Sequence, residues 1–275
     1  MKYLHFVITR FNIPAKYEGK KNPNLEGVDP KTNENYLEQR VKLFERYTVP
    51  SMKSQTNSNF KWLVLFSDQT PQKYKDKMKL LREQNEWFCP LYLKDEEAYE
   101  FDNYLEQILK QYECDQYITT RIDNDDAVSI DFIEAIQKYI VTNNMENTML
   151  SFKYGYQFSE NHSTLSLFLY PQNHFTTMVS PESGKTIISF PHNKIPSNIK
   201  RVLIDSKKSP IWMEIIHKTN YVNKTFFNCK NAVKSTKALD RYDCNILWER
   251  KAVINNLLYS IPGTFKCICS VLSKK

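Results

Sequence analysis

The sequence predicts an α/β fold in which helices flank a mainly parallel central sheet, with an antiparallel extension in the second half. Within residues 1–145, short apolar runs alternate with segments of helical periodicity, the pattern of βαβ units. The run FKWLVLF at 60–66 is almost continuously apolar, which is typical of a strand buried on both faces of a parallel sheet. Beyond residue 146, strand-like runs follow one another with polar connections, which favours hairpins or antiparallel pairing.

Each element of the first half is assigned from its apolar spacing. Leu37, Val41 and Phe44 recur at helical intervals within 36–55, and Pro50 predicts a break or restart of that helix. The other expected helices are 71–85, 101–112 and a segment capped by Ser129 that ends near 141. The expected strands are 3–9, 60–66, 87–93 and 116–121.

The second half lacks this alternation. The expected strands are 149–158, 165–170, 175–179 and 211–217. Residues 192–210 are polar and basic and are expected to be irregular, and a helix is expected from 245, interrupted at Pro262. No low-complexity linker divides the chain, so we expect a single domain over 1–275.

Charge is distributed unevenly. Residues 183–275 hold 17 Lys and Arg against 5 Asp and Glu, whereas residues 1–182 hold 21 against 26. A basic last third suggests an anionic partner, such as a diphosphate, an anionic lipid surface or nucleic acid, although a solvated surface explains it equally well. The 6 Cys form no CxxC pair, which fits a reducing cytoplasm, and no apolar stretch has the length of a membrane-spanning helix.

The strongest chemical signal is the acidic string at 121–126, RIDNDD. Asp123, Asp125 and Asp126 follow directly from a predicted strand, and ligands of open parallel sheets bind at the carboxyl ends of the strands. Three adjacent carboxylates repel one another unless a cation neutralises them, and oxygen ligands suit Mg²⁺, Mn²⁺ or Ca²⁺. A divalent ion held there would share its remaining positions with water and substrate phosphates, as a nucleotide diphosphate leaving group requires.

The acidic string allows two other interpretations. Asp123, Asp125 and Glu134 match the first, third and twelfth positions of a calcium-binding EF-hand loop, but Ala127 and Val128 stand where that loop needs an oxygen ligand and a glycine. A solvated acidic turn that caps a helix is the plainer alternative. The buried strand before the string favours a site over such a turn.

With these motifs in place, the sequence resembles the GT-A glycosyltransferases, and within them a family of bacterial rhamnosyltransferases with an R-x-D-x-D-D signature. Arg121 to Asp126 carry that signature. Upstream, FVITRFN at 6–12 resembles the first strand and its nucleotide loop, and Ser51 to Gln55 resembles the S-x-x-x-Q motif that precedes the second strand. Arg40 and Phe44 also fit the family's helix, and Trp212 to Asn220 resembles its W-x-x-x-x-H-x-x-N segment.

The resemblance implies a metal site with Mn²⁺ or Mg²⁺. Asp125 would be the principal ligand, Asp123 would contact the metal or the ribose, and Asp126 would support the cluster. His217 would approach from the late strand as a further ligand of the metal or diphosphate, unless it is a half-buried strand histidine. His192 is a second candidate, whereas nothing in the sequence suggests a role for His174.

The resemblance also implies a nucleotide site. Thr9, Arg10 and Asn12 would lie in the nucleotide loop, Asp68 near the base or ribose, and Arg121 beside the carboxylates or a phosphate. The turn Ser67-Asp68-Gln69 departs from the paired-acid turn of wider GT-A sequences, which leaves base recognition open. Trp212 is expected in the core or as a platform that stacks on the acceptor.

The function implied is transfer of a hexose from a nucleotide-sugar to the hydroxyl of a saccharide or lipid-linked saccharide, in bacterial surface polysaccharide assembly. Residues 1–145 would be the nucleotide-sugar-binding half, 146–244 the acceptor-binding half and 245–275 a basic C-terminal segment. Glu214, Asp205 and Glu182 are candidate catalytic bases, and spacing does not choose among them. The family's name is not itself evidence for rhamnose.

Two other functions compete. A nucleotidyltransferase usually carries a glycine-rich phosphate loop after the first strand, whereas residues 11–30 hold only Gly19 and Gly27. A nucleic-acid-binding protein would leave the acidic string unexplained and would need a binding motif that the sequence lacks, so no nucleic-acid partner is expected. The segment 245–275 combines apolar and basic residues, which also suggests peripheral contact with an anionic membrane on its cytoplasmic side, with a closing helix on the sheet as the competing interpretation.

Overall fold

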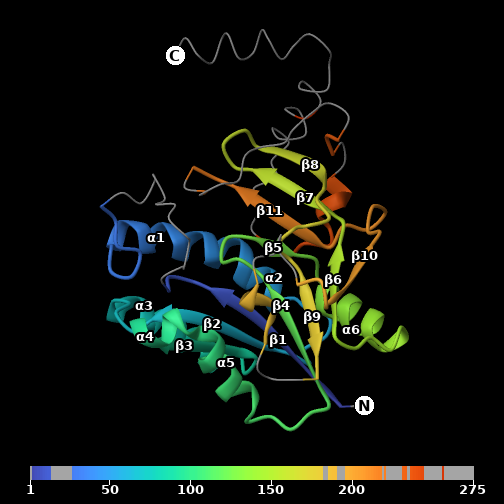
Figure 1. Ribbon diagram of the computed structural model, residues 1–275. Helices are drawn as coiled ribbons and strands as arrows, with labels where there is room; N and C mark the ends of the chain where they lie inside the picture. The colour runs from blue at the N-terminus through green and yellow to red at the C-terminus, as the bar shows by residue number, and fades with distance from the viewer. Residues whose placement is uncertain are drawn as a thin grey trace.

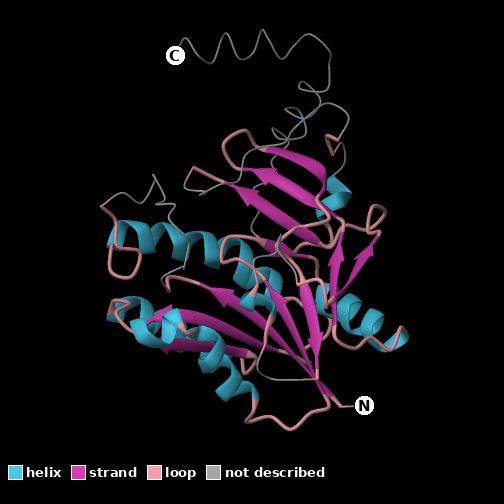
Figure 2. Cartoon of the chain, viewed as in Figure 1, coloured by secondary structure: helices cyan, strands magenta, loops and turns pink. Residues whose placement is uncertain are grey.

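A computed structural model describes residues 2–13, 27–181, 185–190, 196–218, 220, 231–233, 236–244 and 256. A seven-stranded sheet of order β10-β6-β9-β4-β1-β2-β3 carries a second sheet of order β5-β11-β7-β8 beside it (Figure 1). All pairs of the larger sheet are parallel except the two that β9 makes with β4 and β6. The prediction of a mainly parallel sheet flanked by helices, with an antiparallel extension, is therefore confirmed (Figure 2).

The elements follow the chain in the order that the apolar runs predict. The strands are β1 Tyr3–Arg10, β2 Lys61–Ser67, β3 Phe88–Leu93, β4 Gln116–Arg121, β5 Ala127–Val128, β6 Thr148–Phe152, β7 Tyr154–Ser159, β8 Thr164–Leu169, β9 Thr177–Ser180, β10 Lys200–Ile204 and β11 Trp212–Ile216. The helices are α1 Glu34–Leu43, α2 Val49–Lys53, α3 Gln72–Gln84, α4 Asp95–Tyr99, α5 Phe101–Leu109 and α6 Phe132–Thr142, with a π-helical turn η2 Phe44–Thr48 and short 3₁₀ turns η3 Ile187–Ser189 and η4 Thr236–Leu239.

The central strands are buried on both faces, as their apolar runs predict. One core contains apolar side chains of α1, α2, α3 and α6, and a second core on the other face contains those of α4 and α5. In the parallel register, Ile8 of β1 lies opposite Arg121 of β4, and Arg10 lies opposite Leu65 of β2. The carboxyl ends of these three strands therefore meet at one edge of the sheet.

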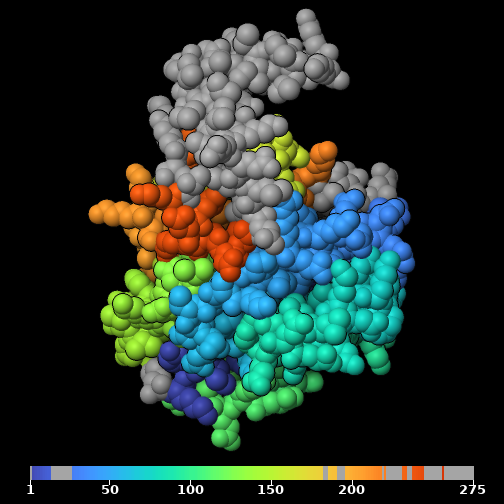
Figure 3. Space-filling model, turned by 180° about the vertical axis from the view of Figure 1, so that it is seen from behind, coloured from blue at the N-terminus to red at the C-terminus, as the bar shows by residue number. Residues whose placement is uncertain are grey.

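The segment predicted as a helix with a break or restart at Pro50 runs without interruption from α1 through η2 into α2, which begins at Val49. Proline has no N–H to donate, and Pro50 stands in the first turn of α2, where that donor is not needed. The π turn before it has the backbone N–H of Val49 bonded to the carbonyl of Phe44, five residues earlier. Seen from behind, this segment (blue) crosses the surface between the cyan-green α3 and the orange-red residues 231–233 and 236–244 (Figure 3).

Three expectations, two for the second half and one for the last helix of the first half, were wrong in detail. The run 149–158 divides at Lys153 into β6 and β7, which belong to different sheets. The segment 192–210, expected to be irregular, contains the edge strand β10. Helix α6 begins after Asp131 rather than at Ser129, whose hydroxyl donates to the Asp131 carboxylate at 2.7 Å.

Arg241 explains where α6 begins. Its guanidinium contacts both carboxylate oxygens of Asp131 at 2.5 Å, and its carbonyl accepts a hydrogen bond from the N–H of Ile130 at 2.8 Å. The helix therefore begins where Arg241 contacts the segment that follows β5.

Among the described residues, no helix is long and apolar enough to cross a membrane. The predictions for the segment 245–275 lie outside the described residues, apart from the single position Asn256.

Candidate functional site

The acidic string forms the loop between β4 and β5, at the edge where the parallel strands end. It leaves the sheet because β5 pairs with β11 of the second sheet, so the loop passes from one sheet to the other. Four consecutive side chains, from Asp123 to Asp126, therefore meet partners on several different elements. These partners determine what each carboxylate can bind.

Asp123 is held by Arg121, the last residue of β4. The guanidinium donates from Nε to one carboxylate oxygen at 2.9 Å and from a terminal nitrogen to the other at 3.0 Å. Burial alone would raise the pKa of Asp123, but the charges of Arg121 and His174 outweigh it and hold this pKa well below its usual range. Arg10 at the end of β1 lowers it further. The charge of Asp123 is thus stabilised by the neighbouring cationic side chains.

Asp126 is paired with His174, which precedes β9. Nε2 of His174 lies 2.6 Å from one carboxylate oxygen, and the backbone N–H of Ile215 donates to the other at 2.9 Å. Burial raises the pKa of Asp126 to about 7. Burial would lower the pKa of His174, but Asp123 and Asp126 outweigh it and raise this pKa to about 9. The pair therefore holds a proton at neutral pH.

Asp125 points to other partners. Its Oδ2 accepts a hydrogen bond from Arg40 of α1 at 2.9 Å and lies 2.8 Å from Nε2 of His217. Burial opposes ionisation, but Arg40 and His217 lower the pKa of Asp125 below its ordinary value. Asn220, the last residue of the W-x-x-x-x-H-x-x-N segment, accepts from the His217 N–H and donates to the Ile215 carbonyl at 3.3 Å. This segment thus fixes His217 against Asp125.

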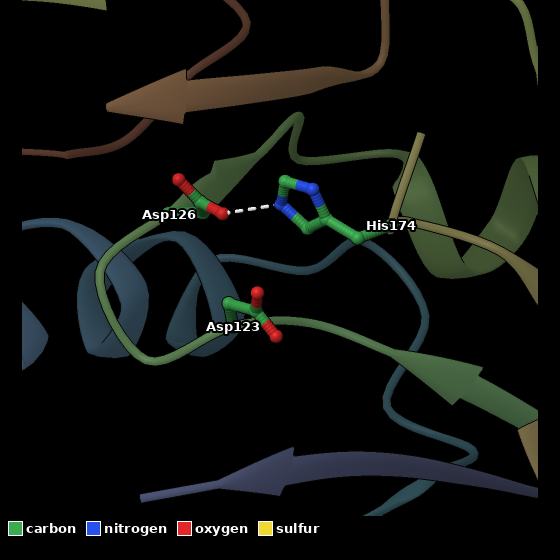
Figure 4. A group of neighbouring side chains, drawn as sticks. All are labelled: Asp123, Asp126 and His174. Carbon is green, nitrogen blue, oxygen red and sulfur yellow. Dashed lines mark hydrogen bonds and ion pairs between the residues drawn. The ribbon is translucent and has the colours of Figure 1, made fainter. Parts of the chain in front are cut away.

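Asp123, Asp126 and His174 fit a divalent cation. One ligand atom from each lies within 4.8 Å of the others, and their side chains turn toward a common space (Figure 4). Two carboxylates and an imidazole are donors that suit Mn²⁺. A cation at this position would replace the proton that Asp126 and His174 hold. Asp125 and His217, which the resemblance suggests as ligands, lie beside this group and bond to each other.

The predicted nucleotide residues lie at the ends of β1 and β2. The hydroxyl of Thr9 is buried, donates to the Ile122 carbonyl at 2.8 Å and accepts from Trp62 at 2.9 Å, so its hydrogen bonds are used within the core. Asn12 is also buried and accepts from the Ser67 N–H at 3.1 Å.

Asn12 also donates to the Thr70 hydroxyl at 3.0 Å, so it fixes the turn that contains Asp68. The carbonyl of Asp68 accepts from Lys75 at 2.6 Å. Thr9 and Asn12 therefore shape the edge of the sheet at which Arg10 and Asp68 lie.

The candidate bases lie in different surroundings. Glu214 is buried in the middle of β11, accepts a hydrogen bond from Gln157 at 2.7 Å, and has its pKa raised by burial, with His174 acting in the opposite sense. Asp205 follows β10, where its carboxylate accepts from the N–H of Lys207 at 3.0 Å and lies 3.7 Å from Lys153. Glu182, like His192, lies outside the described residues.

Trp212 belongs to the core. Its ring is stacked on Phe175 with 5.1 Å between centroids, and its indole N–H donates to the Phe152 carbonyl at 2.7 Å. The ring also fills the space beside Gly155, where an added Cβ would lie 2.0 Å from it. It therefore holds the second sheet against the first, and the expectation of a core residue is confirmed.

Two residues of the site were not recognised from the sequence. His174 reaches Asp126 because β9 runs antiparallel to β4, which places the residues before β9 beside those after β4. A hydrogen bond of 3.0 Å from the N–H of Arg121 to the Thr176 carbonyl continues this pairing. The sequence marks Arg40 only as a match to the family's helix. Knowledge of the β9 pairing would have identified His174.

Comparisons with known proteins bear on the family. The family model described as "Putative rhamnosyl transferase" matches residues 5–228. Curated proteins gave no match to the chain.

Among solved structures, residues 1–349 of S. aureus TarS are similar at a TM-score of 0.41 and 11% identity, over 78% of this chain and 60% of that chain. The same fragment in complex with UDP is similar at a TM-score of 0.42 and 11% identity, over 78% of this chain and 61% of that chain. A third similar structure is that of a "Putative Glucose-1-Phosphate Thymidylyltransferase from Bacillus anthracis in Complex with a Sucrose". Its TM-score is 0.32 and its identity 10%, over 74% of this chain and 90% of that chain.

This chain spans only about three fifths of the TarS fragment that it matches. The structural likenesses are too weak to carry a functional argument. The family model instead spans most of the sequence, including the acidic loop and β11. On this ground the chain belongs to the family described as rhamnosyl transferases.

Proposed function

We propose that the chain is a glycosyltransferase that moves a sugar from a nucleotide-sugar to a hydroxyl acceptor. The observation that carries this proposal is the group of Asp123, Asp126 and His174 at the carboxyl ends of the parallel strands. Ligands of open α/β sheets bind at this edge, and a cation there is placed to meet a diphosphate. The family's description supports group transfer of a sugar.

Different residues of the site would bind the cation and hold the acidic loop in place. Asp123, Asp126 and His174 would hold Mn²⁺ or Mg²⁺, which would supply positive charge beside the diphosphate leaving group. Arg121 holds Asp123 in place, and Arg10 adds a second positive charge that acts on the same carboxylate. These contacts favour an anionic donor at the edge.

Glu214 is the residue we assign as general base. Its carboxylate is buried, and the pKa of Glu214 is raised, which makes it a stronger proton acceptor than an exposed glutamate. The side-chain amide of Gln157 donates a hydrogen bond of 2.7 Å to the Glu214 carboxylate and orients it. The pairing of β7 with β11 and with β8 places Gln157 beside both Glu214 and Ser166 on one face of the second sheet. We propose that the acceptor hydroxyl of a saccharide or lipid-linked saccharide approaches this face, in surface polysaccharide assembly.

The test is ligand-induced thermal stabilisation with UDP, GDP, dTDP and ATP, each with and without Mn²⁺, and with a single-stranded oligonucleotide. We expect one nucleoside diphosphate to raise the unfolding temperature, and to do so only with Mn²⁺. Stabilisation by the oligonucleotide alone would contradict the proposal. Release of pyrophosphate from a nucleoside triphosphate and a sugar phosphate would instead indicate a nucleotidyltransferase.

A further inference from the structure

A cavity of about 300 Å³ lies at the amino ends of β1, β2 and β3, whereas the acidic loop lies at the carboxyl edge of the same sheet. The N label in Figure 1 marks the cavity's end of β1. The residues that line the cavity include none of the candidate site. Pockets for small ligands begin at about 300 Å³, so the cavity has room for one small molecule.

The pairing of β1 with β2 explains why a cavity forms here. Phe6 of β1 lies opposite Lys61, the first residue of β2, so β1 begins three residues before its neighbour. The chain before β2 turns instead of extending the strand, because the N–H of Asn59 bonds to the Asn57 side chain at 2.8 Å. The start of β1 therefore faces a turn, and both line the cavity.

Buried hydrogen bonds hold this turn and the start of β1 in place. The side-chain amide of Gln137 in α6 donates to the Asn59 carbonyl at 2.8 Å and accepts from Asn57 at 2.8 Å. The same amide lies 3.3 Å from Nδ1 of His5, whose Nε2 lies 2.7 Å from the Thr120 hydroxyl. The cavity is thus formed before any ligand enters, which lowers the entropic cost of binding.

Aromatic rings line the cavity from two directions. Phe6 and Tyr112 meet edge to face with 5.3 Å between centroids. Phe60 and Trp87 lie 5.6 Å apart, and Trp87 is stacked on the fully buried Trp62 at 6.0 Å. Trp87 itself is half-buried, so part of its ring is accessible. Such rings bind the C–H groups of a sugar by dispersion and weak hydrogen bonding.

Polar groups stand beside the rings. Ser58 and Asn59 are exposed members of the lining, and Lys61 and Glu86 contribute one charge of each sign. The Lys61 ammonium donates to the Glu86 carbonyl at 3.3 Å. Balanced charges give no preference for an anion, and an acyl chain would displace water from the hydroxyl and the amide without replacing its hydrogen bonds. An uncharged ring rich in hydroxyl groups matches both kinds of wall.

We propose that this cavity is a second saccharide site, which binds an uncharged monosaccharide unit. This inference goes beyond the proposed function and does not depend on it. The eight residues of β1 span about 25 Å, so the cavity and the acidic loop lie at least that strand apart. The sugar bound here is therefore not the one transferred at the acidic loop.

The experiment uses the full chain without nucleotide or metal. Saturation-transfer difference NMR measures the binding of glucose, galactose, mannose, rhamnose and N-acetylglucosamine, with inorganic phosphate as the anionic comparison in calorimetry. Tryptophan fluorescence reports on Trp87, since Trp62 and Trp212 are fully buried. We expect at least one monosaccharide to bind saturably in the millimolar range and to change the fluorescence, and phosphate not to bind.

Variants locate the bound sugar. Ser58→Trp places a large ring in the cavity from an exposed position, and should weaken sugar binding at least about tenfold because the space for the ligand is filled. The matched control is Ser197→Trp, an exposed serine before β10, which three strands separate from β1. Trp87→Phe keeps a ring against Trp62 and should abolish the fluorescence change while the NMR signal remains.

Three results would overturn the inference: no monosaccharide binds, phosphate binds in their place, or folded Ser58→Trp binds sugar as well as wild type does. A fluorescence change that persists in Trp87→Phe would also place the sugar elsewhere. UDP with Mn²⁺ should stabilise Ser58→Trp as it does wild type. Loss of nucleotide binding with retained sugar binding would contradict the proposed function alone, so the two failures are distinguishable.

Discussion

Nε2 of His174 lies 2.6 Å from Oδ2 of Asp126, although 48 residues separate them in the chain. The contact depends on β9, which runs antiparallel to β4 and brings the segment before it to the acidic loop. Without His174, the acidic loop would offer a cation carboxylates alone. The site is therefore built from both halves of the sequence.

We predict that His174→Gln weakens Mn²⁺ binding about tenfold or more, because the amide replaces an imidazole ligand and no longer balances Asp126. Calorimetric titration with Mn²⁺ measures the change, and circular dichroism checks the fold. The matched control is His162→Gln, since His162 lies in the exposed turn between β7 and β8. Equal Mn²⁺ affinities for the His174 variant and wild type would exclude His174 from the site.

Glu214→Gln should lower kcat about a hundredfold or more and leave the KM for the donor nearly unchanged, because only proton acceptance is removed. The pKa of Glu214 is raised by burial, so turnover should fall as pH drops through a value above that of an ordinary glutamate. Asp205→Asn is the comparison, since that carboxylate is exposed beside Lys153. A larger loss in Asp205→Asn would move the role of base to Asp205.

Gly155→Ala should destabilise the protein by at least about 2 kcal/mol, because overpacking a rigid core forces side chains and backbone to shift. An added Cβ would lie 2.0 Å from the ring of Trp212, which cannot retreat because it is stacked on Phe175. Urea unfolding measures the loss. Adding Trp212→Phe to Gly155→Ala should recover part of the lost free energy of unfolding. If the losses of the two single variants simply add in the double variant, this account of the contact is contradicted.

His5 predicts a pH dependence of stability. It is buried with Nε2 2.7 Å from the Thr120 hydroxyl, and burial lowers the pKa of His5 to about 3. The unfolded chain takes up this proton near pH 6.5, whereas the folded chain resists it. The stability is therefore fully present above pH 6.5 and is lost as pH falls toward 3, by about 1.4 kcal/mol per pH unit for this group. Urea midpoints between pH 7 and 5 should fall less steeply in His5→Asn, and equal slopes would contradict the assignment.

The first half of the fold follows from the sequence because burial determines its elements. The apolar runs of β1, β2 and β4 are buried on both faces, and each was predicted within two residues of its bounds. The acidic string and the family resemblance predict the metal candidates, whereas spacing leaves Glu214 as one of three candidate bases. The approach of His217 to Asp125, at 2.8 Å, agrees with the geometry that the resemblance suggests.

The rest depends on pairing that a single sequence does not contain. Strand β10 begins with Lys200 and Arg201 and keeps Leu203 exposed, so it shows neither an apolar run nor a clean alternation. Strand β5 has two residues and exists because β11 lies beside it. His174 and Arg40 reach the acidic loop from other elements, and nothing in their local sequence predicts that contact.

The π turn at 44–48 makes the number of residues in the continuous helical segment α1-η2-α2 as important for its contacts as their identity. Arg40, before the turn, contacts the acidic loop, whereas Arg46 and Tyr47 within it bond to Glu160 between β7 and β8. Deleting one residue from the turn would restore ordinary α-helical bonding and rotate one end of the helix against the other by about 100°. One of the two sets of contacts would then be lost. Insertions and deletions between residues 40 and 47 should therefore be far less tolerated than substitutions at its exposed positions.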